Sequence, residues 1–173
     1  MNSTLKFGLL GGVLLASTIL FYTFDLTSSG FFLLWTIAQV AIIIFAIYFG
    51  VKEEKKVKHN NSISYRDAII TGLKINFIIA LIHSLSMFLY FHYQPDEISK
   101  LKQSNIEKAM KDMKELKFEE SVIKDHIKFI NQDITPFNLA KNNFMIILVL
   151  GLVFSLIITA ILRKKDEEPI ASK

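Results

Sequence analysis

The chain has 173 residues, of which 51% are hydrophobic and 21% are charged, and its formal net charge is +4. It contains no cysteine, which excludes disulfides, thiolate catalysis and cysteine-ligated metal sites within these residues. The positive charge does not predict a nucleic-acid partner, because no pattern of interleaved basic and aromatic residues accompanies it.

Four long stretches without Asp, Glu, Lys or Arg alternate with charged connections. A helix needs about 20 mainly apolar residues to cross a hydrocarbon core about 30 Å thick. We therefore predict an all-α membrane protein whose four transmembrane helices form an antiparallel bundle in the lipid bilayer. The expected spans are about 5–24, 31–51, 67–93 and 140–163, within a single membrane domain covering 1–173.

The short connections predict the orientation. The connection at 25–30 has no Lys or Arg, whereas the one at 52–66 carries Lys52, Lys55, Lys56, Lys58 and Arg66. Arg163, Lys164 and Lys165 follow the last span directly. Lys and Arg in short loops mark the cytoplasmic side of a membrane protein. We expect a multi-pass protein of the bacterial inner (cytoplasmic) membrane with both the N and C termini in the cytoplasm.

The long extracytoplasmic connection between the third and fourth helices is expected to be a helical loop at about 96–134. Asp96 is the predicted N-cap of its first helix, and Thr135-Pro136 is the predicted start of the fourth helix, outside the membrane. Between them a stripe recurs at spacings of three and four, at Ile98, Leu101, Asn105, Ala109, Met113 and Leu116, and a second, shorter stripe follows at Val122, Ile123, Ile127 and Ile130. The loop is interpreted either as a structural hairpin or as a docking surface.

Small residues recur every four positions in two of the spans. They are Gly8, Gly12 and Ala16 in the first span, and Gly151, Ser155 and Thr159 in the fourth. Small residues at this spacing let helix backbones approach closely in lipid. We predict that the first and fourth helices pack against each other through these faces, or that the faces join two copies in a homo-oligomer or bind another membrane protein.

Polar side chains within the spans define a candidate site. A rise of 1.5 Å per residue places Gln39 of the second helix between Asn76 and His83 of the third in depth, and Ser17 of the first helix at a similar level, so that a mid-membrane cluster of these four is sterically possible. One hypothesis is that this intramembrane polar cluster binds a ligand or relays protons through His83. The other is that these side chains form hydrogen bonds between helices.

The sequence contains no motif that predicts catalysis. The four histidines fall on different segments, and neither a paired-histidine metal motif nor a glycine-rich phosphate loop occurs. The run from Lys52 to Lys56 is interpreted as a solvated charge run beside the membrane. We expect no enzymatic activity, no catalytic residue, no cofactor and no metal.

Several segments carry a family resemblance: Tyr48-Phe49-Gly50-Val51-Lys52, the stretch 62–73, Tyr93-Gln94-Pro95-Asp96 and Arg163-Lys164-Lys165. With them the chain resembles small bacterial four-span membrane proteins catalogued only as a domain of unknown function. The resemblance implies the four-span fold and no activity.

The most specific part of this resemblance is the start of the third helix. Ser64 is expected to cap the helix with Asp67 at the third position, close to a capping box. Ala68 and Gly72 then offer a flat surface where a neighbouring helix enters.

The leading functional hypothesis is a non-enzymatic structural or accessory protein of the cell envelope, which acts through helix–helix or loop contacts. The alternative is a small oligomeric transporter or channel subunit that uses the polar face of the third helix.

Overall fold

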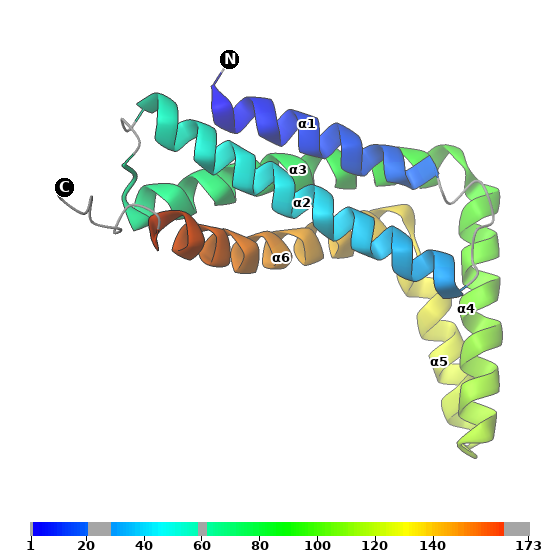
Figure 1. Cartoon of the computed structure of the whole chain (residues 1–173). Coiled ribbons are helices and arrows are strands. Elements are labelled where there is room, and N and C mark those ends of the chain that lie inside the picture. Colours follow the sequence, from blue (N-terminus) through cyan, green and yellow to red (C-terminus); the bar gives the residue numbers. More distant parts are fainter. Residues whose placement is uncertain (1, 21–28, 59–61, 165–173) are drawn as a thin grey trace, which may run out of the picture. The chain divides into compact units, whose positions relative to one another are not determined.

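The computed structural model describes residues 2–20, 29–58 and 62–164, and within these ranges the chain forms six helices and no strand. The helices are α1 (Ser3–Ser17), α2 (Ser29–Lys58), α3 (Tyr65–Tyr93), α4 (Pro95–Glu115), α5 (Glu120–Asp133) and α6 (Pro136–Lys164) (Figure 1). Four helical segments are long and apolar enough to cross a membrane: Ser3–Leu20, Leu33–Val57, Tyr65–Tyr93 and Pro136–Leu162. The predicted all-helical class and the four apolar helices are confirmed. The end of the first expected span, at 21–24, lies outside the described residues.

The chain divides into two compact units. The first joins Met1–Ser84 to Asn143–Lys173, and the second comprises Leu85–Asn142. The first unit therefore holds α1, α2, the greater part of α3 and most of α6, whereas the second holds α4 and α5.

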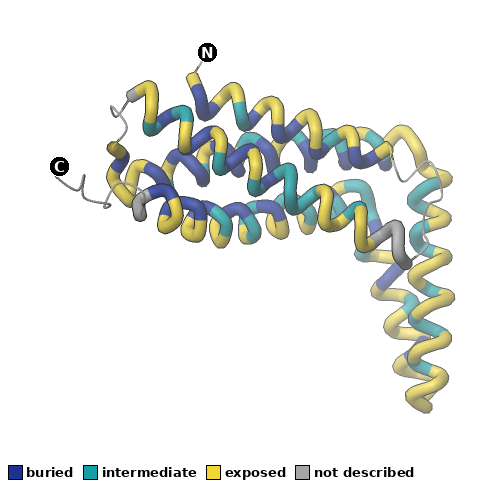
Figure 2. The backbone as a smooth tube through the Cα atoms, in the orientation of Figure 1, coloured by how far each residue is buried: buried dark blue, intermediate teal, exposed yellow. Residues whose placement is uncertain are grey.

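Apolar side chains lie both inside and outside the first unit. Ile47 and Val51 of α2 and Ile75 and Ile79 of α3 are fully buried. The outward faces of the same helices also carry apolar side chains, since Phe45 of α2 is 59% exposed and Phe77 of α3 is 51% exposed. Figure 2 shows how exposed and buried residues are distributed along the helices. Helices that are apolar on both faces are typical of a protein whose surroundings are lipid.

The glycines of α1 face α3. A Cβ atom at Gly8 would lie 2.8 Å from the Cβ of Ile78, and one at Gly12 would lie 2.7 Å from the Cδ1 of Ile82. Each absent side chain therefore leaves room for a branched isoleucine. The prediction that the small-residue faces of the first and last helices pack against each other is wrong, because the glycines of both helices meet α3.

The predicted cap of α3 at Ser64 is confirmed. The backbone N–H of Asp67 donates to Ser64 Oγ at 3.1 Å, and the Ser64 hydroxyl donates to Asp67 Oδ2 at 2.6 Å. This pair satisfies one of the amide groups that a helix N-terminus leaves without a partner.

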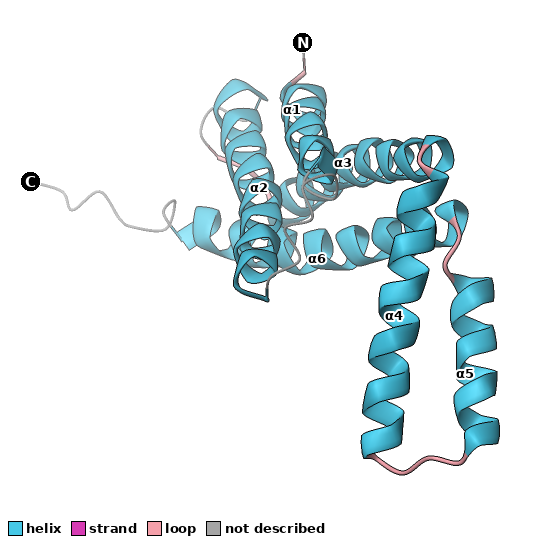
Figure 3. Cartoon of the chain, turned by 90° about the vertical axis from the view of Figure 1, so that its right-hand side faces the viewer, coloured by secondary structure: helices cyan, strands magenta, loops and turns pink. Residues whose placement is uncertain are grey.

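In the second unit, α4 and α5 form a helical hairpin (Figure 3). The hairpin turns at Lys117, whose φ of 56° lies in the left-handed region. The Phe118 N–H donates to the Met113 carbonyl and the Lys117 N–H donates to the Lys114 carbonyl, which is the Schellman pattern. Ile123 and Ile130 of α5 are buried.

The predicted caps of this unit have different outcomes. The expectation that Asp96 is an N-cap is wrong, because the N-cap is Gln94, two residues earlier, and Pro95 is the first residue of α4. Proline suits that position because its missing N–H would have no helical partner there. The predicted cap of α6 is confirmed, since the Asn138 N–H donates to Thr135 Oγ1 at 3.2 Å.

Candidate functional site: buried polar side chains of α3 and α6

The most deeply buried polar side chains of the first unit gather on two helices. Asn76 and His83 of α3 are 0% and 2% exposed, and Ser155 and Thr159 of α6 are each 1% exposed. Intramembrane polar groups are costly unless they face protein. Their burial marks the contact between α3 and α6 as the candidate site.

Small residues bring these two helices together. A Cβ atom at Gly72 would lie 2.6 Å from Ser155 Oγ, and a Cβ atom at Gly151 would overlap the side-chain amide of Asn76. From the first of these contacts to the second, the residue number rises by four in α3 and falls by four in α6. The two helices are therefore antiparallel where they meet, and the small residues predicted on each helix contribute to this contact.

Asn76 reaches across the seam to the backbone of α6. Its Nδ2 donates to the Ile147 carbonyl at 3.0 Å and approaches the Leu148 carbonyl at 3.4 Å. These carbonyls lie one turn before Gly151, whose missing side chain gives the amide access to them. Such an interhelical bond is worth about 0.6–2 kcal/mol in lipid.

Several atoms along the two helices have no hydrogen-bond partner among the described residues. They are Asn76 Oδ1, His83 Nδ1, Ser84 Oγ, the Tyr90 hydroxyl, Ser155 Oγ and Thr159 Oγ1. A buried polar atom left without a partner costs free energy. The contact between α3 and α6 therefore combines one interhelical hydrogen bond, from Asn76, with hydroxyl side chains that contribute mainly by being small enough for the helices to approach closely.

The four residues of the predicted polar cluster have different neighbours. The Ser17 hydroxyl donates to the Leu14 carbonyl of its own helix at 2.7 Å, and Ser17 is exposed. Gln39 Nε2 donates to Thr18 Oγ1 at 2.9 Å, which joins α2 to the end of α1. Asn76 bonds to α6, and His83 is buried near the backbone of Leu15 in α1. The hydrogen bonds of Ser17, Gln39 and Asn76 are made to other groups, and a functional role for the four residues together stays a prediction.

A second polar cluster, at the start of α1 and the end of α2, was missed by sequence reasoning. Glu54 is only 5% exposed and accepts a hydrogen bond from Ser3 Oγ at 2.7 Å. Beside it, Lys6 Nζ lies 2.9 Å from Glu53 Oε2. The interpretation of the run from Lys52 to Lys56 as solvated is therefore wrong for Glu54.

The charged end of α2 also contacts α6. Lys55 Nζ donates to the Leu162 carbonyl at 3.3 Å, close to the end of α6. A cation at a helix C-terminus meets carbonyl groups that have no helical partner. The signal that could have identified Glu54 is its spacing, because it follows the buried Ile47 and Val51 at seven and three residues on one helical face.

These polar contacts hold helices against one another. Among the described residues, no group of three or more His, Cys, Asp or Glu side chains is placed to hold a metal ion. The polar groups described above bond to backbone carbonyls, to hydroxyls or to an opposite charge across helix contacts. The arrangement can fix the register of helices against one another.

Comparison with known families gives one match. A family model described as "Protein of unknown function (DUF4199)" matches residues 6–164. The match confirms the resemblance to a family catalogued only as a domain of unknown function. Searches of curated proteins and of solved structures found no match.

Proposed function

The chain belongs to the DUF4199 family of proteins of unknown function, and we propose that it is a non-enzymatic structural or accessory protein of the cell envelope. Its four apolar helices are those of an integral membrane protein. In this proposal the protein acts through helix–helix contacts in lipid or through the α4–α5 hairpin, with another membrane protein or a second copy as partner.

The main support for the proposal is that the buried polar groups form hydrogen bonds between helices. Asn76 bonds to the backbone of α6, and Glu54 accepts a hydrogen bond from α1. Both groups connect helices, which is the role expected of polar side chains in a scaffold. The exposed Leu116 and Phe118 at the tip of the hairpin add apolar surface for a loop contact.

The proposal includes a topology. We place the four apolar helices as an antiparallel bundle in the bacterial inner membrane, with both termini in the cytoplasm and the α4–α5 hairpin outside. The support is the contrast between the Lys-rich connection after α2 and the connection at 25–30, which has no Lys or Arg.

The alternative of a transporter or channel subunit is not favoured. It would use the Asn76 and His83 face of α3 as a polar path, yet these side chains are 0% and 2% exposed. The Asn76 amide is also held against α6 by its own hydrogen bond.

Cross-linking in native membranes tests the proposal. The chain has no cysteine, so a single cysteine at the exposed Ser104 of α4 gives one attachment point on the hairpin. A matched cysteine at Val149, on the exposed apolar face of α6, is the control for random encounters in lipid. A discrete adduct from Ser104→Cys but not from Val149→Cys supports a loop contact. A monomer at every position tested and at every detergent concentration would contradict the accessory role.

A further inference from the structure

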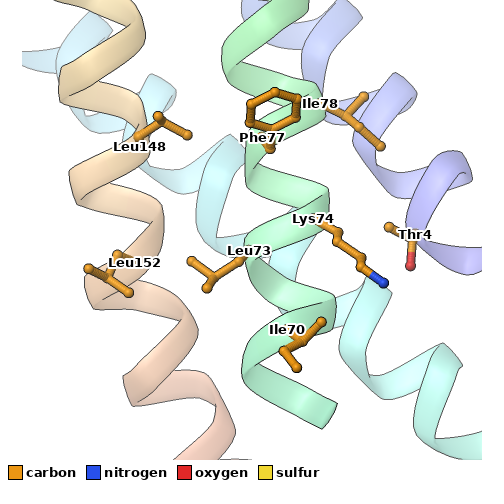
Figure 4. Close-up of a pocket in the computed structure, with 8 residues that line it drawn as sticks. All are labelled: Thr4, Ile70, Leu73, Lys74, Phe77, Ile78, Leu148 and Leu152. Carbon is orange, nitrogen blue, oxygen red and sulfur yellow. The ribbon is translucent and has the colours of Figure 1, made fainter. Parts of the chain in front are cut away.

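An apolar groove lies on the surface of the first unit. Its volume is about 700 Å³. The residues that line it come from α1, α3 and α6, and are Thr4, Ile70, Leu73, Lys74, Phe77, Ile78, Leu148 and Leu152 (Figure 4). The groove is open along one side, and Phe77 and Leu152 remain 51% and 44% exposed.

Lys74 is the one charged side chain among the residues that line this groove. It lies nine residues after the first residue of α3, or about 14 Å along the helix axis at 1.5 Å per residue. The residue is exposed, and no carboxylate among the described residues lies within ion-pair distance of it. An ionisable residue within a candidate span is by default a functional-site hypothesis, and the natural partner of a lysine is an anion.

Thr4 contributes a hydroxyl group to the same groove. Figure 4 shows the Lys74 ammonium group and the Thr4 hydroxyl on the same side of the groove, while the leucines extend along α3 and α6. A cation and a hydroxyl can bind a phosphate oxygen, and the apolar lining can accommodate a hydrocarbon chain. The two parts of the groove therefore match the two parts of a phospholipid.

We propose that this groove binds an anionic phospholipid, with the lipid phosphate at Lys74 and Thr4 and an acyl chain along Leu73, Phe77 and Leu152. The inference depends on the membrane location of α3 but not on the accessory role, so either can fail alone. Basic pockets between transmembrane helices are known sites for anionic headgroups. A lysine that only extends toward the interface would bind no particular lipid.

Lipid-specific stabilisation of the purified chain in neutral detergent tests the proposal. Binding is followed by native mass spectrometry and by the thermal unfolding midpoint, with phosphatidylglycerol or phosphatidylethanolamine added. We expect phosphatidylglycerol to bind preferentially and to raise the midpoint. Lys74→Gln should weaken that binding about fivefold or more, since one lysine near an anionic surface contributes about 1 kcal/mol. Lys74→Arg should retain it.

Two further variants separate the charge from the groove. Lys52→Gln removes an exposed lysine at the end of α2, outside the groove, and should leave binding unchanged. Leu152→Trp adds volume to the groove without altering charge, and should weaken binding of the phospholipid. Inorganic phosphate at equal ionic strength should not compete. Three results would each overturn the proposal: equal binding of the two lipids, an equal loss of phosphatidylglycerol binding in Lys52→Gln and Lys74→Gln, or competition by inorganic phosphate.

Discussion

The side-chain amide of Asn76 in α3 lies directly against the backbone of Gly151 in α6, in the space that any Cβ atom at position 151 would occupy. Its Nδ2 donates to the Ile147 carbonyl one turn earlier. The glycine and the asparagine therefore depend on each other: one supplies the space and the other uses it to bond to the neighbouring helix.

Gly151→Ala should destabilise the protein, although alanine is the better helix former by about 1 kcal/mol. The added methyl group would overlap the Asn76 amide, and overpacking of this kind typically costs about 1–3 kcal/mol. Thermal unfolding in detergent measures the change.

A double-mutant cycle supplies the control for this prediction. Asn76→Ala alone should lose about 0.6–2 kcal/mol with its interhelical bond. Gly151→Ala should then cost little in the Asn76→Ala background, because the overlapping amide is gone. Additive losses in the double variant would contradict the described contact.

The neighbouring acids of α2 should differ in their effect on stability. Glu54 is buried and accepts from Ser3, so Glu54→Ala should cost about 1–3 kcal/mol of unfolding free energy. Glu53 pairs with Lys6 where both side chains are partly exposed, and Glu53→Ala should cost about 1 kcal/mol or less. Denaturant titration of both variants under one condition decides the order, and an inverted order would show that Glu54 is solvated.

Ser64→Ala should weaken the start of α3. The variant loses both hydrogen bonds of the Ser64–Asp67 pair, which corresponds to about 1 kcal/mol for a typical N-cap. Ser62→Ala, two residues earlier and outside the helix, is the matched control and should change stability by less than about 0.5 kcal/mol. Amide hydrogen exchange over 65–70 should accelerate in the first variant only.

Lys117→Gly should stabilise the α4–α5 hairpin. Lysine at this left-handed position carries a steric cost of about 1 kcal/mol that glycine does not have. Lys114→Gly, three residues earlier inside α4, should have the opposite effect and cost about 1 kcal/mol. Hydrogen exchange of the α4 and α5 amides reports both changes, and slower exchange in Lys114→Gly would contradict the assignment of the turn.

The proposed topology predicts which connections are accessible from outside an intact cell. A single cysteine replacing Ser104 should react with a membrane-impermeant maleimide added to whole cells. A single cysteine replacing Ser62 should react only after the membrane is permeabilised. Reaction of Ser62→Cys in intact cells would invert the orientation.

The positions of the helices and their apolar character can be predicted from the amino-acid sequence alone. Span length and the absence of charge are properties of single segments, so the four apolar helices were predictable without a fold. Capping at Ser64 and Thr135 was predictable for the same reason, because a cap and its partner lie within four residues of each other.

Which helix faces contact one another is visible only in the folded chain. The glycine repeat of α1 marked a close approach but not its partner, and that partner is α3. The burial of Glu54 and the reach of Asn76 to the Ile147 carbonyl likewise depend on residues 51 and 71 positions away in the chain. A repeat of small residues has the same spacing whichever helix it contacts, so it does not identify its partner. The partner is set by how the helices align with one another in three dimensions, and the sequence pattern of one helix does not contain that information.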